Sequence, residues 1–317
     1  MNTPVVVANP EPPRRSAISL VLGSGGARGY AHVGVIEELQ AQGYVIQSVA
    51  GSSMGALVGG VFAAGKLEAY RHWSSSLKTF DVLRLVDWTW RGGGLIKGHR
   101  VISALREMVG DIDIEDLPIS YTAVAVDIDA QREVWFSRGS LFDAIRASIS
   151  IPTVFRPHLY QGRRLVDGGL LNPVPVTPTL RDLTDATIAV DVNAEAEGIS
   201  ERETPITRPE IVEPVSADSA GFSFSRIGAA FERFMEKRSR RVAVTEPGLL
   251  ELFARSLDVV QETLTRYKLA AQPPDLVISI PRNVCAFYEF QRADEVIEVG
   301  RLRTREALAR WQRARRG

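Results

Sequence analysis

Two glycine-rich turns limit what this chain can fold into more than any other feature. Residues 23–29 follow an apolar, strand-like run at 18–22, and residues 51–55 follow a similar run at 46–50. Each turn leads directly into a stretch with helical periodicity, and Gly43 lies where it can end the helix between the two runs. The pattern predicts a βαβ unit, in which two parallel strands are joined by a helix.

The alternation of strand-like and helical segments continues along the chain. Further strand-like runs lie at residues 122–128, 133–136, 187–192 and 275–280. Helical periodicity returns near the C-terminus, over residues 249–269 and 293–316. This order is typical of an α/β protein, and we expect a mostly parallel central sheet covered by helices on both faces, with a helical C-terminal region.

Composition excludes several classes of protein. The 38 Lys and Arg balance the 38 Asp and Glu, so no net positive charge attracts nucleic acid, and we expect no nucleic-acid partner. Cys285 is the only cysteine, which excludes a disulfide framework and a thiolate metal cluster. The longest apolar stretch, residues 54–64, is shorter than the roughly 20 residues that span a bilayer.

Four regions of the chain differ in composition. The proline-containing residues 1–17 predict a flexible arm, and residues 18–193 carry the alternating pattern of a core domain. Residues 194–218 combine Glu and Pro without an apolar period and predict an acidic loop, whereas residues 219–317 predict a helical region packed on the same domain. The run at 18–22 is short for an export signal and is typical of a first strand, so we expect a cytoplasmic protein.

Ser53 is the central residue of a Gly-x-Ser-x-Gly pentapeptide that lies between a strand-like run and a helix. A sharp turn in this context lifts the serine hydroxyl clear of the sheet, and the helix N-terminus favours negative charge that develops beside it. Gly51 and Gly55 avoid side-chain clashes at such a turn. Ser53 is therefore a candidate nucleophile, with an ordinary helix N-cap as the alternative.

Chain order disfavours a histidine as the base for this serine. Four histidines precede the last acid motif, and none follows it: His32, His72, His99 and His158. In an α/β-hydrolase the histidine follows the acid. Asp167 is the leading candidate instead, because a carboxylate can act as a general base and because Gly168 and Gly169 let another loop approach it closely. The alternative is an Asx turn in a glycine bend.

The loop at residues 23–29 is suited to bind an anion. Its backbone N–H groups lie at a helix N-terminus, so Gly25 and Gly26 can supply the donors of an oxyanion hole while Arg28 adds positive charge or holds the loop in place. Arg28 stands where a Rossmann motif needs its third glycine, and the Gly-Lys-Ser/Thr ending of a P-loop is missing. Binding of a bare phosphate stays open.

In this order and at these separations, the three motifs resemble those of the patatin-like phospholipases of the short bacterial type, over residues 18–193. The resemblance implies a patatin-like fold, with Ser53 and Asp167 as a Ser–Asp catalytic dyad. It assigns the supporting glycines and arginine as follows: Gly25, Gly26, Arg28 and Gly29 to the oxyanion hole, Gly51 and Gly55 to the turn at the nucleophile, and Gly168 and Gly169 to the acid motif.

The resemblance also implies a reaction and a class of substrate. The expected activity is hydrolysis of the acyl esters of phospholipids, lysophospholipids or related lipids, without a metal or a cofactor. A catalytically silent scaffold and a phosphate or nucleotide binder that uses residues 23–29 are the alternatives.

The helix predicted over residues 222–241 carries phenylalanines opposite a basic face. Such a helix can lie in a lipid headgroup layer, so it predicts peripheral contact with the inner membrane surface. Packing in the core or at an interface is the alternative.

Overall fold

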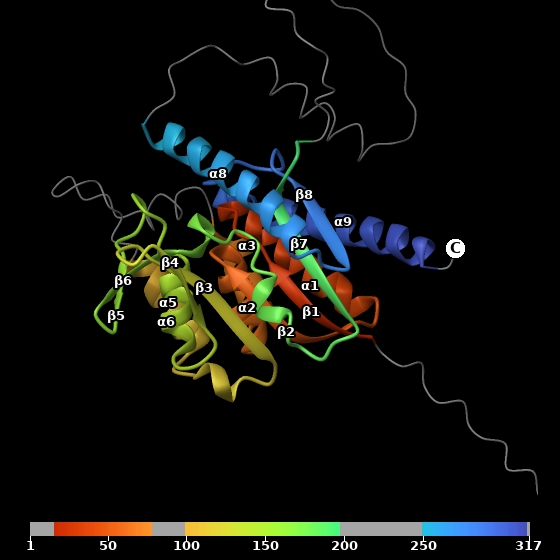
Figure 1. The fold of residues 1–317 in the computed structure, drawn as a ribbon, viewed down its shortest axis with the longest axis horizontal. Coiled ribbons are helices and arrows are strands. Elements are labelled where there is room, and N and C mark those ends of the chain that lie inside the picture. Colours follow the sequence, from red (N-terminus) through yellow and green to blue (C-terminus); the bar gives the residue numbers. More distant parts are fainter. Residues whose placement is uncertain (1–15, 78–98, 197–248, 316–317) are drawn as a thin grey trace, which may run out of the picture. The chain divides into compact units, whose positions relative to one another are not determined.

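The computed structural model describes residues 16–77, 99–196 and 249–315. They contain a mostly parallel sheet with helices on both of its faces, as the sequence predicts (Figure 1). The strands are β1 (Ala17–Leu22), β2 (Val45–Ser52), β3 (Ser120–Asp127), β4 (Arg132–Phe136), β5 (His158–Tyr160), β6 (Arg163–Asp167), β7 (Ala186–Ala194) and β8 (Leu276–Pro281).

Seven α-helices are described, together with five short 3₁₀ turns. The α-helices are α1 (Ala31–Ala41), α2 (Met54–Ala63), α3 (Leu67–Ser76), α5 (His99–Val109), α6 (Leu141–Ser148), α8 (Leu249–Ala271) and α9 (Ala293–Ala314). The 3₁₀ turns are η1 (Gly26–Tyr30), η2 (Ile114–Asp116), η3 (Gly168–Leu170), η4 (Thr177–Thr179) and η5 (Phe290–Arg292). None of these helices combines the length and the apolar character that crossing a membrane requires.

The strand order places the ends of the predicted motifs at one edge of the sheet. Along the order β5-β6-β3-β2-β1-β7-β8, the pairs from β3 to β8 are parallel, whereas β5, β6 and β4 pair antiparallel with their neighbours. The turns at residues 23–29 and 51–55 follow β1 and β2, which are adjacent and parallel. The carboxyl ends of these two strands therefore lie together.

Alternating side chains of β1 show how the two faces of the sheet are filled. Ile18, Leu20 and Leu22 lie in the main core, with buried side chains of α1, α2, α6 and α9. Val21 points to the other face and lies in a smaller apolar cluster, against which Leu269 of α8 packs. Figure 1 shows α8 on that face of the sheet, in front of β7.

The C-terminal part of the chain belongs to the same compact unit as the sheet. This unit comprises Met1–Glu197 and Arg255–Gly317, and β8 pairs with β7 inside it. A second unit, Gly198–Ala254, is described only from residue 249, where α8 begins. The predicted arm up to residue 15, the acidic loop beyond residue 196 and the predicted helix 222–241 lie outside the described residues, so membrane contact stays a prediction.

Helices α1 and α9 approach each other closely at two glycines. A Cβ atom added to Gly34 would lie 1.9 Å from the carbonyl oxygen of Ile297, and one added to Gly300 would lie 2.1 Å from that of Ala31. The backbones of the two helices are therefore in direct contact at these glycines. Any larger side chain there would increase the distance between the helices.

Replacing Gly300 with Ala should lower the free energy of unfolding by about 1–3 kcal/mol, because a methyl group has no room between the helices. Urea-induced unfolding measures the change. Ala309→Leu, on the exposed side of α9, is the matched control and should change stability little. Equal stability of Gly300→Ala and the wild type would contradict the close crossing.

Candidate active site

Ser53 occupies a strained turn between β2 and α2. Its backbone has φ 55° and ψ −123°, a conformation that side-chain-bearing residues rarely adopt. A Cβ atom on Gly55 would lie 2.0 Å from the carbonyl oxygen of Leu22, so the glycine lets the end of β1 pack against the turn. Ser53 stands at the N-cap position of α2, but its side chain makes no capping hydrogen bond to the helix.

The hydroxyl of Ser53 donates a hydrogen bond to Asp167 instead. The distance from Ser53 Oγ to Asp167 Oδ2 is 2.5 Å, and both side chains are buried. Asp167 ends β6, where it lies opposite Ala125 of β3. Its other oxygen, Oδ1, accepts the N–H of Gly169 at 2.7 Å. The fold thus brings the two predicted residues together, and the Asx turn orients the same carboxylate that accepts from Ser53.

The surroundings of Asp167 move its pKa toward neutrality. Burial raises the pKa of this carboxyl from its ordinary value of 3.8 to about 7, although the hydrogen bonds from Ser53 and Gly169 act in the opposite direction. A group that accepts and returns a proton works best when its pKa is near the working pH. Asp167 therefore has the position and the proton affinity of a general base.

Ser148, at the end of α6, holds the backbone of the turn. The N–H of Ser53 donates to Ser148 Oγ at 2.9 Å, and that hydroxyl donates to the carbonyl of Val124 at 2.6 Å. The hydroxyl links the turn at Ser53 to β3, which also pairs with the strand that carries Asp167. Spacing in the sequence does not show this role, because Ser148 lies 95 residues from Ser53.

The loop at residues 23–29 presents two consecutive backbone donors. Among the described residues, no protein atom accepts a hydrogen bond from the N–H of Gly25 or Gly26. The N–H of Ala27, in contrast, donates to the carbonyl of Phe287 at 2.9 Å. Gly26 has φ +56°, and a Cβ atom there would lie 2.6 Å from the same carbonyl oxygen. The loop can therefore offer the donors that an oxyanion hole needs.

Arg28 and Gly29 support this loop rather than add donors to it. The guanidinium of Arg28 donates from Nε to the carbonyl of Gly25 at 3.2 Å and forms an ion pair with Asp258 of α8 at 2.6 Å. A Cβ atom on Gly29 would lie 2.3 Å from the side chain of Met54. Gly29 thus lets the loop pack against the residue that follows Ser53.

Comparison with known proteins identifies the family. The family model described as patatin-like phospholipase matches residues 20–180. The chain belongs to the patatin-like phospholipase family. It is 42% identical to the NTE family proteins Mb1092c of Mycobacterium bovis and Rv1063c of Mycobacterium tuberculosis, over 93% of this chain and 92% of each relative.

Two more distant similarities involve longer proteins. Neuropathy target esterase sws of Drosophila persimilis is 34% identical over 50% of this chain, which corresponds to 12% of the esterase. The solved structure of VipD from Legionella pneumophila matches 94% of this chain and 67% of its own with a TM-score of 0.44 and 13% identity. The family match indicates a lipid acyl hydrolase.

Three histidines of this patatin-like protein have described side chains, His32, His72 and His158, and none of them forms a hydrogen bond with Ser53 or Asp167. His32 is buried, and its Nε2 lies 2.8 Å from the carbonyl oxygen of Gly23, which can only accept a hydrogen bond. Burial lowers the pKa of His32 to about 4, so the ring is neutral and carries its proton on Nε2. His158 lies 3.2 Å from Asp143, and His72 is exposed.

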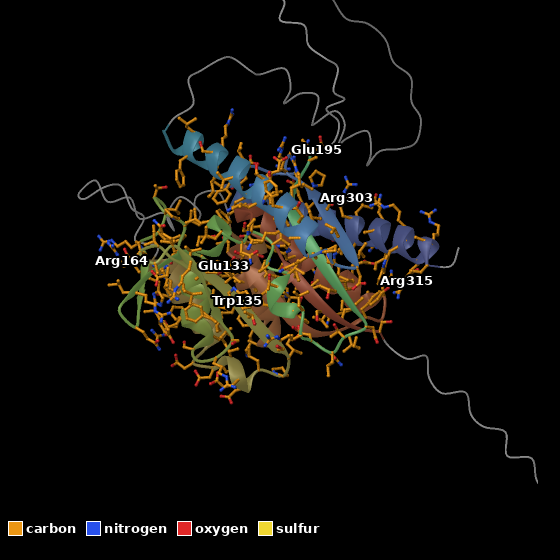
Figure 2. The ribbon with its side chains drawn as sticks, in the orientation of Figure 1. Glu133, Trp135, Arg164, Glu195, Arg303 and Arg315 are labelled. Carbon is orange, nitrogen blue, oxygen red and sulfur yellow. The ribbon has the colours of Figure 1, made fainter. Side chains whose placement is uncertain are left out.

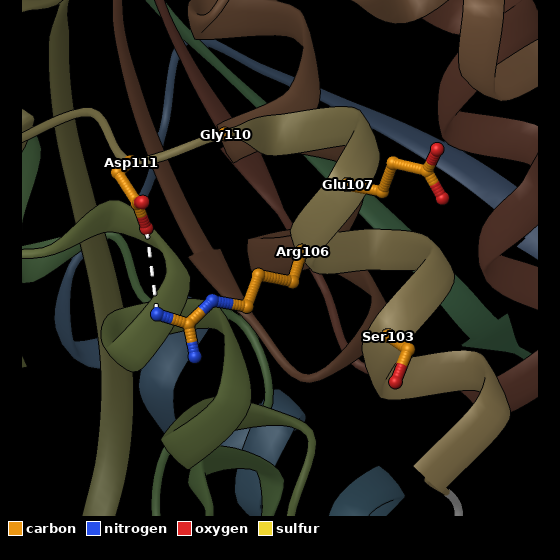
Figure 3. A pocket seen from close by; sticks show the side chains of 5 residues that line it. All are labelled: Ser103, Arg106, Glu107, Gly110 and Asp111. Carbon is orange, nitrogen blue, oxygen red and sulfur yellow. Dashed lines mark hydrogen bonds and ion pairs between the residues drawn. The ribbon is translucent and has the colours of Figure 1, made fainter.

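Two further features of the described residues concern metal ligands and a surface hollow. Within residues 16–77, 99–196 and 249–315, no group of three or more His, Cys, Asp or Glu side chains could hold a metal ion. A surface hollow beside α5 contains an ion pair between Arg106 and Asp111, at 3.5 Å (Figure 3). None of the residues that line it belongs to the three motifs: Ser103, Arg106, Glu107, Gly110 and Asp111.

The pKa of Asp167 predicts how activity depends on pH. Below about 7 the carboxyl is protonated and cannot accept the proton of Ser53, and above it the carboxylate is ionised. The kcat/KM for a neutral, soluble ester should therefore rise about tenfold per pH unit below 7 and level off above it. A profile that stays flat from about pH 5 to 9 would contradict a base with this pKa.

Proposed function

We propose that this protein hydrolyses the acyl esters of lipids with a Ser–Asp dyad formed by Ser53 and Asp167. The observation that carries the proposal is the 2.5 Å hydrogen bond between the two side chains. It supplies a nucleophile with an adjacent base, which is the arrangement that makes a serine hydroxyl reactive. The hydrogen-bond geometry and the family membership support it independently.

The chemistry proceeds in two halves. In the first, Ser53 Oγ bonds to the ester carbonyl carbon while its proton passes to Asp167, and the carbonyl oxygen becomes an oxyanion. Collapse of this intermediate breaks the bond to the leaving alcohol, which takes the proton from Asp167. In the second half, Asp167 accepts a proton from water as the water attacks the acyl-enzyme, and the proton then returns to Ser53 as the fatty acid leaves.

The loop donors act on the charge that appears during the reaction. In this proposal the N–H groups of Gly25 and Gly26 bind the oxyanion, which carries more negative charge than the ester carbonyl of the substrate. Donors that are fixed before the reaction need no rearrangement when the charge forms. The positive φ of Gly26 and the contact with Phe287 support a loop of this kind.

Phospholipids and lysophospholipids are the proposed substrates, which makes the activity that of a phospholipase A or lysophospholipase. The names of the family and of the neuropathy target esterase relative support a lipid ester. Phosphate or nucleotide binding by residues 23–29 is disfavoured, because the guanidinium of Arg28 is already paired with Asp258 and the N–H of Ala27 with Phe287. A silent scaffold has no need for the buried pair of Ser53 and Asp167.

We expect each of two single substitutions, Ser53→Ala and Asp167→Asn, to lower the rate of ester hydrolysis by about 10⁴- to 10⁶-fold. The double variant should be scarcely slower than either single variant, because the two residues act as a unit. Hydrolysis of a p-nitrophenyl ester by folded protein measures the effect. Asp129→Asn is the matched control, since it removes an exposed carboxylate that pairs with Arg164. Near-normal turnover by Ser53→Ala would refute the proposal.

A further inference from the structure

The loop that carries Gly25 and Gly26 is held by residues beyond the part of the chain that the family model matches. That match ends at residue 180. Phe287, in the connection between β8 and α9, accepts the N–H of Ala27, and Asn193 near the end of β7 donates from Nδ2 to the carbonyl of Ser24 at 2.7 Å. Helix α8 adds two further contacts with the loop.

The first contact is the ion pair between Arg28 and Asp258. The Arg28 side chain is 3% exposed and the Asp258 side chain 30% exposed, so solvent screens the pair only in part. The same guanidinium donates to the carbonyl of Gly25. Because one planar group bonds to both α8 and the backbone of Gly25, the position of Asp258 affects the position of the first proposed oxyanion donor.

The second contact is Gln261, one helical turn further along α8. It is 3% exposed, and its Oε1 accepts from the hydroxyl of Ser24 at 2.9 Å and from Asn193 Nδ2 at 3.4 Å. A Cβ atom on Gly169 would lie 2.5 Å from Gln261 Nε2 and 3.0 Å from Asp167 Oδ1. Gln261 therefore touches both the oxyanion loop and the turn that orients the base.

Both polar and apolar side chains attach α8 to the rest of the unit. Lys268 Nζ donates to Glu133 on β4 at 2.7 Å, and Figure 2 labels Glu133 beside Trp135. Leu257 is buried, and Leu269 packs on the smaller apolar cluster. Hydrogen bonds and ion pairs are directional, so they fix the orientation of a helix more strictly than apolar contacts of similar strength do.

We propose that Asp258 and Gln261 of α8 are positioning residues for the oxyanion hole. Asp258 acts through Arg28, and Gln261 acts through Ser24 and Asn193, to hold the N–H groups of Gly25 and Gly26 where the oxyanion forms. The inference rests on the proposed function, because it assigns a role in the same reaction. It extends the catalytic unit to a helix that carries none of the three motifs.

Asp258→Asn and Gln261→Ala test this role, with Glu262→Gln as the matched control. Glu262 lies on the same helix, and its ion pairs are with Arg266 and Arg282 rather than with a residue of the loop. Loss of either positioning contact should lower kcat for a small soluble ester by roughly 10- to 100-fold. The KM should change by less than about threefold, because misplaced donors weaken mainly the binding of the transition state. Glu262→Gln should retain the wild-type kcat.

Two further variants separate positioning from a general loss of structure. Asp258→Glu keeps a carboxylate for Arg28 and should recover most of the kcat that Asp258→Asn loses. Combining Asp258→Asn with Arg28→Met should cost little more than Arg28→Met alone, because both changes remove one interaction. If Asp258→Asn does not fold, Gln261→Ala makes the same kcat test on the other contact.

The outcomes distinguish the inference from the function on which it rests. Unchanged kcat in both Asp258→Asn and Gln261→Ala, with Ser53→Ala inactive, would overturn the role of α8 and leave the dyad intact. Equal losses of kcat in Glu262→Gln and Asp258→Asn would also overturn it. An active Ser53→Ala would instead refute the proposed function itself.

Discussion

The candidate active site depends on one buried interaction, the hydrogen bond from the hydroxyl of Ser53 to the carboxyl group of Asp167. Removing an ionised carboxylate from water costs free energy, and the hydrogen bonds from Ser53 and Gly169 compensate only part of this cost. The pKa of Asp167 therefore rises to about 7. Because the folded state then holds the proton more tightly than the unfolded chain, stability falls as the pH rises from about 4 to 7. The fold tolerates this destabilisation at the site where the proposed reaction needs a proton acceptor.

The sheet makes the buried pair possible by bringing distant segments to one edge. Ser53 follows β2 and Asp167 ends β6, and β3 pairs with both strands. A glycine lets the turn after Asp167 lie close to the backbone of β3, since a Cβ atom on Gly168 would lie 2.1 Å from the carbonyl oxygen of Val124. Backbone therefore packs directly against backbone around the two side chains, which leaves the proposed dyad little freedom to move.

The three motifs could be predicted from the sequence because each depends on local chemistry: a glycine where the backbone is crowded, a serine at a strand-to-helix turn, an acid before two glycines. The predicted strand at 18–22 agrees with β1 to within one residue. The strands β5 and β6 were not predicted, since each is short and β6 opens with two arginines. The contact of Gln261 with Ser24 spans 237 residues and follows only from the packing of α8, which no local pattern encodes.

The most direct test of the Ser–Asp account is to label the protein with a fluorophosphonate, which reacts with activated serines, and to locate the adduct by peptide mass mapping. The account predicts one adduct, on Ser53, formed by the wild type and lost almost completely in Asp167→Asn, where the serine has no base. An adduct on a different serine, or ester hydrolysis by a protein whose Ser53 stays unlabelled, would contradict it.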